Sequence, residues 1–251
     1  LLQHGRVRVN GKPIRKHDHM VGPGDAIAIA RPEAPAEPGR TAAIVFEDES
    51  VIAIDKPSGL LTVATESEKT DTAFARLSAL LAGRKAGRPF VVHRLDRETS
   101  GLLLFARTAE IRDRLQDEWD AVEKTYLAVV EGKPRPAAGV LENHLTEGKN
   151  LRVRVTAPGG AAKHAVTRYR LIANHRPYSL VEVVLQTGRK HQIRVHLAGL
   201  GCPVIGDTDY GAKTNRAGRL GLHAWKLAFR HPVSGQRIEL ESPLPEILWK
   251  R

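Results

Sequence analysis

The sequence predicts an α+β fold, built around a mostly antiparallel or mixed β-sheet with flanking helices and preceded by a small N-terminal module. Stretches with strand character outnumber stretches with helical spacing. The two kinds do not alternate regularly, as they would in a doubly wound fold with a parallel sheet. A chain of 251 residues is also long enough for one large domain and a small appendage.

The first thirty residues have the pattern of a small β-rich module. Val7–Val9 and Ala26–Ile29 read as short strands. Asn10-Gly11 is a typical hairpin turn, and Pro23-Gly24-Asp25 is a second turn signal. We therefore predict that Leu1 to Ala30 forms a separate module.

A change in composition separates this module from the rest of the chain. Arg31 to Arg40 is rich in Pro, Ala and Glu and lacks large apolar residues, which is typical of an extended linker. From Thr41 onward the pattern is globular. The predicted organisation is thus a module over residues 1–30, a linker over 31–40 and a main domain over 41–251.

Apolar runs and helical spacing give the elements of the main domain. Helices are expected over Thr72–Leu81 and Ala109–Trp119, and after Gly188. Strands are expected over apolar or alternating runs, namely Ala42–Phe46, Val51–Ile54, Leu102–Ala106, Tyr126–Val130, Leu151–Val155, Val166–Ile172, Leu180–Leu185 and Gln236–Glu241.

The charge balance favours a polyanionic partner. Lys and Arg number 39 against 28 acidic residues, a formal net charge of +11. An excess of like charge repels itself in a compact fold, so nucleic acid is one explanation, and a basic surface that aids solubility is the other. The longest apolar run, Leu102–Ala106, is too short to span a membrane. Cys202 is the single cysteine, so no disulfide forms within the chain, which fits a reducing, cytoplasmic location.

One loop carries an acid between two cations. His93 to Gly101 reads HRLDRETSG and leads into the buried run Leu102–Ala106. Cations on both sides keep the carboxylate of Asp96 ionised, which suits a nucleophile or a general base. The structural alternative is that Asp96 caps a turn and pairs with Arg94 or Arg97, because structural ion pairs perturb carboxylates as well.

A second basic stretch follows Gly188 and reads GRKHQIRVHL. If it is helical, His191 and Arg194 are three residues apart and share a face. His191 and His196 are five apart and point in different directions, so they do not form a zinc-binding pair, and no metal site is expected. A plain basic surface helix is the alternative.

Two further stretches have simple local interpretations. Tyr126, in KTYLA, begins an apolar strand, and half-buried packing with a satisfied hydroxyl would explain it. Asp55 to Leu60 reads DKPSGL and indicates a strand that ends in a turn.

Together, these four stretches resemble the RluA family of pseudouridine synthases. The resemblance covers roughly residues 41–251 and includes the stretches HRLDRETSG, KPSG, KTYLAVVEG, GRKHQIRVHLAGLGCPVIGD and LHA, in the order of the family. Residues Gly5 to Ile29 resemble the C-terminal part of an S4-type RNA-binding module, through GRVRVNGKPI and GPGDAIAI. The resemblance implies the pseudouridine synthase fold.

It also implies a reaction and the residues that perform it. Uridine already in RNA would be detached from its ribose, turned and rejoined through C5, with no cofactor and no metal. Asp96 would be the catalytic carboxylate, acting on C6 of uracil, on C1′ of the ribose or on the 2′ proton. Arg194 would hold Asp96, and Tyr126 would lie over the base and assist removal of the C5 proton.

The same resemblance places the substrate contacts. Arg94 would fill the space left by the extruded nucleotide, and Leu222 would pack against the base. Arg189, His191 and Gln192, in the second motif, would contact the substrate. Extrusion is required because the reacting atoms are out of reach inside a base stack. Ribosomal RNA is the expected substrate ahead of tRNA, and the expected protein is a monomer that does not bind membranes.

Two other classes of function compete with this interpretation. A non-catalytic RNA-binding protein associated with ribosomes would explain the charge, but not an acid in the best-matched motif, since a carboxylate repels phosphate. A nucleoside or glycoside hydrolase is also built around a carboxylate, but it needs a second acid to activate water. The remaining candidates for that acid, Glu98, Asp207 and Asp209, lie in stretches that the family pattern already explains.

Overall fold

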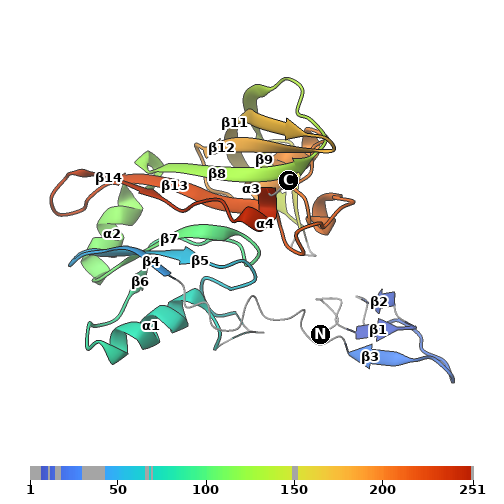
Figure 1. Cartoon of the computed structure of the whole chain (residues 1–251), viewed down its shortest axis with the longest axis horizontal. Helices are drawn as coiled ribbons and strands as arrows, with labels where there is room; N and C mark the ends of the chain where they lie inside the picture. The colour runs from blue at the N-terminus through green and yellow to red at the C-terminus, as the bar shows by residue number, and fades with distance from the viewer. Residues whose placement is uncertain are drawn as a thin grey trace. The chain divides into compact units, whose positions relative to one another are not determined.

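The computed structural model describes residues 7–10, 12–14, 18–29, 43–65, 68, 70–148 and 152–249. The chain divides into two compact units, residues 1–40 and 41–251, which are drawn in Figure 1. The predicted linker, Arg31 to Arg40, lies outside the described residues. No helix of the described part is long and apolar enough to cross a membrane.

The N-terminal unit contains a three-stranded antiparallel sheet in the order β2-β1-β3. The strands are β1 (Val7–Val9), β2 (Lys12–Ile14) and β3 (Ile27–Ile29). Asn10 follows β1 with a positive φ of 52°, as the predicted hairpin turn requires. The Asn10 side chain accepts from the Ala26 amide at 2.9 Å and donates to Asp25 at 2.7 Å, which ties the hairpin to the chain entering β3.

The large unit is built on one 11-stranded sheet with the path β10-β9-β11-β12-β8-β13-β7-β5-β4, beside which β14 pairs with β13 and β6 pairs with β7. Its strands are β4 (Ala43–Glu47), β5 (Val51–Lys56), β6 (Phe90–Val91), β7 (Ser100–Ala106), β8 (Glu123–Glu131), β9 (Ala138–Glu147), β10 (Val153–Thr156), β11 (Lys163–His175), β12 (Tyr178–Leu185), β13 (Leu222–Arg230) and β14 (Arg237–Glu241). Its helices are α1 (Ala73–Gly83), α2 (Ala109–Asp117), α3 (Gln192–Gly199) and α4 (Glu246–Trp249), with the 3₁₀ turns η2 (Trp119–Ala121) and η3 (Thr208–Tyr210).

A single parallel pair joins two antiparallel halves of this sheet. Strands β7 and β13 run parallel, with His223 opposite Ser100 and Ala224 opposite Gly101, whereas the other described pairs of the sheet are antiparallel. Figure 1 shows β4, β5 and β7 on one side of this junction and β8, β12 and β11 on the other. The start of β7 and the start of β13 therefore lie at the same end of the sheet.

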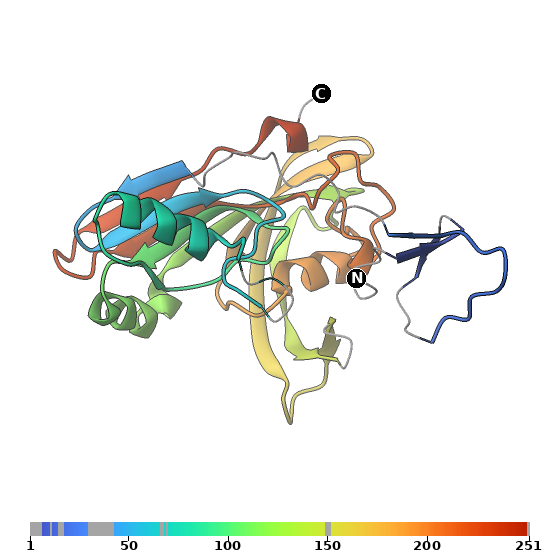
Figure 2. The ribbon, with the colours of Figure 1, turned by 90° about the horizontal axis from the view of Figure 1, so that it is seen from below.

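The helices cover both faces of the sheet. Along β5, Val51 and Ala53 pack in the cluster that includes α2, while Ile52 and Ile54 pack in the cluster that includes α1. Helix α3 packs over β8 and β12 in a third cluster. Tyr126 belongs to both the α1 cluster and the α3 cluster, so α1 and α3 cover the same face and Tyr126 lies where their cores meet. Figure 2 shows the ends of β9 and β11 extending beyond α3.

The observed architecture confirms the predicted α+β class and its mostly antiparallel sheet. Helix α1 begins where it was expected, because the Thr72 hydroxyl caps it by accepting from the Ala75 amide at 3.0 Å. The second predicted helix ends earlier, at Asp117, and a 3₁₀ turn follows. Strands β6, β9 and β13 were not predicted.

Candidate active site

Asp96 lies in the loop between β6 and β7, and residues at the end of β5 and in the turn after it donate hydrogen bonds to the backbone of this loop. Nζ of Lys56 donates to the carbonyl oxygen of Arg97 at 3.1 Å, and the Gly59 amide donates to the same oxygen at 2.9 Å. Ser58 Oγ donates to the carbonyl oxygen of Glu98 at 2.6 Å. The backbone after Asp96 is therefore fixed by three donors.

The backbone before Asp96 is fixed in the same way. The hydroxyl of Thr62 donates to the carbonyl oxygen of Leu95 at 3.0 Å and accepts from the Leu95 amide at 3.1 Å. Further back, the His93 ring stacks on Trp119 with centroids 4.4 Å apart, and its Nε2 accepts from the Leu104 amide at 3.0 Å. Asp96 is thus presented by a rigid loop, while 29% of its side chain stays exposed.

Two side chains from the start of α3 reach Asp96. His191 Nε2 lies 3.9 Å and Arg194 Nη1 lies 4.0 Å from the same oxygen, Asp96 Oδ2. His191 precedes the helix with a positive φ of 53°, an unusual conformation for a residue with a side chain. Both contacts are made to one carboxylate oxygen, so His191 and Arg194 approach Asp96 from the same side.

Arg194 makes its shortest contacts with another acid. Its Nε and Nη2 donate to the two carboxylate oxygens of Asp207 at 2.7 and 2.8 Å. Its guanidinium carbon lies 4.9 Å from the centre of the Tyr210 ring. Burial lowers the pKa of Arg194, but the hydrogen bonds and charge of Asp207, with the charge of Asp96, more than offset this, so the pKa is raised. Arg194 remains charged.

His191 is held by Tyr210 as well. Its Nδ1 hydrogen-bonds to the Tyr210 hydroxyl at 2.8 Å, and that hydroxyl also accepts from the Val153 amide at 3.0 Å. Burial lowers the pKa of His191, and the nearby charge of Asp96 opposes that shift only in part. The imidazole is therefore mostly neutral at pH 7 and can accept or donate a hydrogen bond.

Tyr126 lies at the level of the site on the central strands. It pairs with Ala224 of β13, which in turn lies opposite Gly101 of β7. Burial, and secondly the charge of Asp96, raise the pKa of Tyr126, so the hydroxyl keeps its proton at neutral pH. Within the described part of the chain this hydroxyl has no hydrogen bond, which leaves it available to a substrate. Leu222, buried at the start of β13, packs in the cluster to which Tyr126 also contributes.

The other predicted contacts differ in accessibility. The Arg94 and Arg189 side chains are exposed, and Arg189 Nε donates to the His164 carbonyl oxygen at 3.0 Å. Gln192 is buried, and its amide group makes four hydrogen bonds, to the Thr187 hydroxyl, the Arg189 amide, the Val166 carbonyl oxygen and the Thr167 hydroxyl. In this structure Gln192 stabilises the turn before α3. Its contact with substrate stays a prediction.

His191 and His196 have separate surroundings. Both ring nitrogens of His196 are engaged by protein, Nδ1 by Thr167 at 2.8 Å and Nε2 by Asn143 at 2.9 Å. Among the described residues, no group of three or more His, Cys, Asp or Glu side chains is arranged to hold a metal ion.

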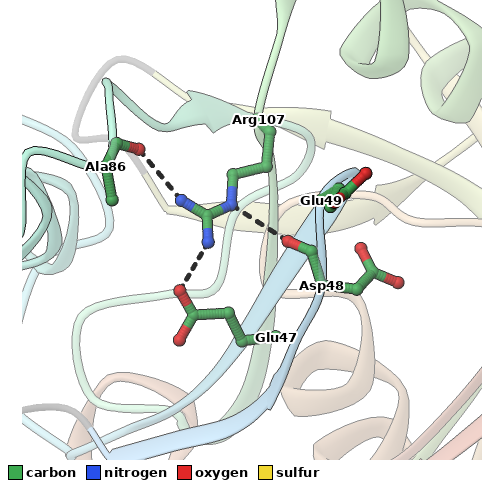
Figure 3. Close-up of a pocket in the computed structure, with 5 residues that line it drawn as sticks. All are labelled: Glu47, Asp48, Glu49, Ala86 and Arg107. Atoms are coloured by element: carbon green, nitrogen blue, oxygen red, sulfur yellow. Dashed lines mark hydrogen bonds and ion pairs between the residues drawn. The ribbon is translucent and has the colours of Figure 1, made fainter.

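A surface hollow at the β4–β5 turn lies away from this site. Figure 3 shows that the Arg107 side chain points into it toward Glu47, Asp48 and Ala86, with hydrogen bonds to all three. Val51 pairs with Ala106 at this end of β5, whereas Lys56 pairs with Gly101 at the end near Asp96. Three acidic residues line the hollow, so it repels phosphate and does not suit RNA.

The structure also brings in residues to which the sequence analysis gave no part in supporting the site. Thr62, Asp207 and Tyr210 stabilise the Asp96 loop or the α3 residues, and Lys56 was read only as part of a turn. Asp207 and Lys56 lie within matched stretches, GCPVIGD and KPSG, which is the signal that could have drawn attention to them. Their pairing with Arg194 and Arg97 could not be read from spacing.

Comparison with known proteins gave matches in both units of the chain. Residues 50–199 match the family model described as RNA pseudouridylate synthase, and residues 1–27 match the S4 domain. An uncharacterized RNA pseudouridine synthase of Mycobacterium bovis is 34% identical, over 98% of this chain and 84% of its own length. A ribosomal large subunit pseudouridine synthase D of Neisseria meningitidis is 32% identical, over 99% of this chain and 71% of its own length.

Solved structures show the same fold. Human RNA pseudouridylate synthase domain containing 4 superposes with a TM-score of 0.68 at 27% identity, covering 82% of this chain and 90% of that one. A second human protein, RNA pseudouridylate synthase domain containing 1, gives a TM-score of 0.67 at 25% identity, covering 84% of this chain and 89% of that one. The family model and the relatives cover most of the chain and the solved structures share its fold, so the chain belongs to the RNA pseudouridylate synthase family, the isomerases that convert uridine to pseudouridine within RNA.

Proposed function

We propose that this enzyme isomerises specific uridines of ribosomal RNA and that Asp96 is its catalytic carboxylate. One observation carries the assignment of Asp96. It is a partly exposed acid on a loop fixed from both sides, with His191 and Arg194 within 4.0 Å of one of its oxygens and Tyr126 close enough to feel its charge. A rigid scaffold with an accessible reacting group is what catalysis by positioning requires.

The arrangement suits each of the three routes open to a lone carboxylate. Asp96 Oδ can bond to C6 of uracil, with the electron pair of the C5–C6 bond moving into the ring carbonyl. It can bond to C1′, with the pair of the broken glycosidic bond leaving on N1. It can take the 2′ proton, with N1 leaving as a C1′–C2′ double bond forms. The first step of each route neutralises the carboxylate charge, which returns when the product is released.

The surroundings of Asp207, an acid near Asp96, argue against hydrolysis. A glycoside hydrolase uses one carboxyl as acid and another as nucleophile or base, and water must reach the site. Asp207, the acid held by Arg194, has a fully buried side chain with both oxygens occupied. It cannot activate water, which favours transfer of the detached base back to the ribose.

Three observations support ribosomal RNA as the substrate. Relatives over nearly the whole chain include proteins named ribosomal large subunit pseudouridine synthase D. The N-terminal residues match the S4 domain, and the net charge is +11. In this proposal the target nucleotide flips out of its stack, the exposed Arg94 takes its place, and Leu222 packs against the base near Tyr126. We also infer that the enzyme acts as a monomer in the cytoplasm.

The test is mapping of pseudouridine in total RNA from cells that lack the gene and carry either the wild type or Asp96→Asn. We expect the wild type to restore one or a few sites in ribosomal RNA and Asp96→Asn to restore none, while the variant protein folds and binds RNA normally. Restored sites confined to tRNA would overturn the ribosomal assignment. Activity of Asp96→Asn above a few per cent of wild type would overturn the role of Asp96.

A further inference from the structure

Arg194 lies within 4.0 Å of three acids, and its contacts with them are unequal; the exposed Asp209 lies 3.6 Å from Nη2. The edge formed by Nε and Nη2 is closed by Asp207 at 2.7 and 2.8 Å, and only Nη1 faces Asp96, at 4.0 Å. The Arg194 side chain is 9% exposed and that of Asp207 is 0% exposed, so the pair is screened from water. Asp96, at 29%, is not.

The backbone around Asp207 is built to keep it there. Gly206 has a φ of +77°, and a Cβ at this position would lie 2.3 Å from the carbonyl oxygen of Arg219, so only glycine fits. The Asp207 amide donates to the Val204 carbonyl oxygen at 3.1 Å, and the Asp207 carbonyl oxygen accepts from Tyr210 and Ala212 at 3.1 and 3.0 Å. Asp207 is therefore a fixed partner of Arg194.

The unequal contacts of Arg194 matter when Asp96 changes charge during the reaction. On every route described above, the negative charge of Asp96 disappears during the reaction. If Asp96 were the sole partner of Arg194, the reaction would strand a buried, unpaired cation, which is strongly unfavourable. With Asp207 in place, the cation keeps a partner throughout.

We propose that Asp207 is a positioning residue, the permanent counter-ion of Arg194 that lets Asp96 give up its charge without stranding the arginine. Resting on the proposed role of Asp96, this predicts a specific defect. In Asp207→Asn the freed charge of Arg194 turns to Asp96 and stabilises its ionised form. Asp96 then becomes a weaker nucleophile or base, although it is intact.

The rival explanation is that Asp207 only stabilises the fold. It predicts a lower melting temperature and a smaller active fraction, but the surviving enzyme would keep the wild-type dependence on pH. The acidic limb of the kcat profile, where activity falls as Asp96 is protonated, therefore separates the two explanations. A charge freed beside Asp96 favours its ionised form, so that limb moves to lower pH.

The experiment compares the kcat and KM of wild type, Asp207→Asn and Asp209→Asn on one RNA across pH. For Asp207→Asn we expect kcat at least about tenfold lower, KM little changed, and the acidic limb about one unit lower in pH. Asp209→Asn is the matched control, since it removes the same charge 3.6 Å from Arg194 at a side chain that is 42% exposed and well screened. The acidic limb of Asp209→Asn should lie at the same pH as that of the wild type.

Each outcome decides the proposal. A limb that is unmoved or shifted upward in Asp207→Asn overturns the counter-ion role, even if kcat falls. If that variant fails to fold, Asp207→Glu is used; it keeps the charge, so its limb must match the wild type while kcat falls, and a displaced limb overturns the proposal. Asp96→Asn is measured alongside. If it stays active, the assignment of Asp96 fails, whereas an inactive Asp96→Asn with an unmoved limb in Asp207→Asn rejects only the counter-ion.

Discussion

The ring and the hydroxyl of Tyr126 contribute separately to the site. The ring belongs to the cores under α1 and α3, while the hydroxyl keeps its proton because burial, and then the charge of Asp96, raise its pKa. If Asp96 loses its charge during the reaction, that second contribution vanishes and ionisation of the Tyr126 hydroxyl becomes easier, although burial still opposes it.

Tyr126→Phe should therefore bind RNA as well as the wild type and lose most of its turnover, by about 100-fold or more if the hydroxyl takes part in proton transfer. Steady-state kcat and KM on one RNA provide the measurement. Wild-type kcat in Tyr126→Phe would reduce the residue to a packing role.

His93 makes stability depend on pH. Burial, and then the charge of Lys124, lower the pKa of its imidazole from 6.5 to about 3, and Nε2 accepts the Leu104 amide only while it is unprotonated. Between these two pH values the unfolded chain binds a proton that the folded chain does not. The contribution of His93 is therefore complete above pH 6.5 and is lost as pH falls toward 3.

The prediction is a difference in slope between wild type and His93→Gln, whose side-chain oxygen can still accept from Leu104 but does not titrate. Below pH 6.5 the unfolding free energy of the wild type should fall more steeply, by up to about 1.4 kcal/mol per pH unit. Urea denaturation at pH 7, 6, 5 and 4 gives both slopes. Parallel curves would mean that His93 is not buried as a neutral ring.

At this scale the sequence indicated the proposed site residues better than the residues that support them. Asp96, Tyr126 and Arg194 stood out because each lies in a motif with a chemical purpose. Asp207 did not, since a carboxylate thirteen residues from an arginine has no periodic relation to it. Only the turn through Gly206 brings them together. Gln192 was predicted as a substrate contact from the resemblance, whereas in the fold its amide group is hydrogen-bonded within the turn before α3.

At the scale of elements, the position of Asp96 relative to Tyr126 depends on how closely β7 and β13 approach. Gly101 has a φ of +108°, and a Cβ there would lie 2.2 Å from the carbonyl oxygen of Ala224. No side chain rotation relieves that overlap, because the atom it meets belongs to the backbone. Any larger residue must push the two strands apart.

Gly101→Ala should cost about 3 kcal/mol or more of folding stability and abolish activity in whatever protein folds. Gly235→Ala is the control, with a φ of +70° and open space around its Cβ, and it should cost about 1–2 kcal/mol. Urea denaturation and turnover of both variants form the comparison. Equal losses would show that backbone conformation alone, without the strand contact, explains the glycine.

Strands β9 and β13, which sequence reasoning missed, both lack a continuous pattern of burial. Strand β9 alternates between partly buried and exposed residues, so it carries no apolar run. Strand β13 is interrupted by Lys226, at a register shift against β8 that breaks the alternation. Helix α1 and strands β5 and β7 were predicted well because their patterns reflect continuous burial. Local patterns are informative when one environment persists along an element.

At the scale of the whole molecule, the chain combines a unit that carries the chemistry with a unit that matches an RNA-binding domain. Residues that approach Asp96 in the described structure all come from the second unit, residues 41–251. We propose that residues 1–40 contribute to the choice and retention of RNA. A tethered second contact raises the effective concentration of the catalytic unit near its target.

Deletion of residues 1–40 should therefore leave turnover unchanged on a short RNA that contains the target, and lower kcat/KM on full-length structured RNA by about tenfold or more. The same two substrates are measured with the full chain. Equal losses on both would mean that the segment supports the fold, and no loss on either would mean that it has no role in RNA binding.

The place of β13 in the sheet has a consequence for how the chain folds. Strands β4 to β7 can pair among themselves, and so can β8 to β12, but β13 inserts between β8 and β7 although it follows both in the chain. Until residues 222–230 are available, two half-sheets exist, each with an open edge. Such late, long-range pairing slows folding and exposes intermediates to aggregation. Because Leu222 and Ala224 reach the site on this strand, a growing chain gains its activity only after that insertion.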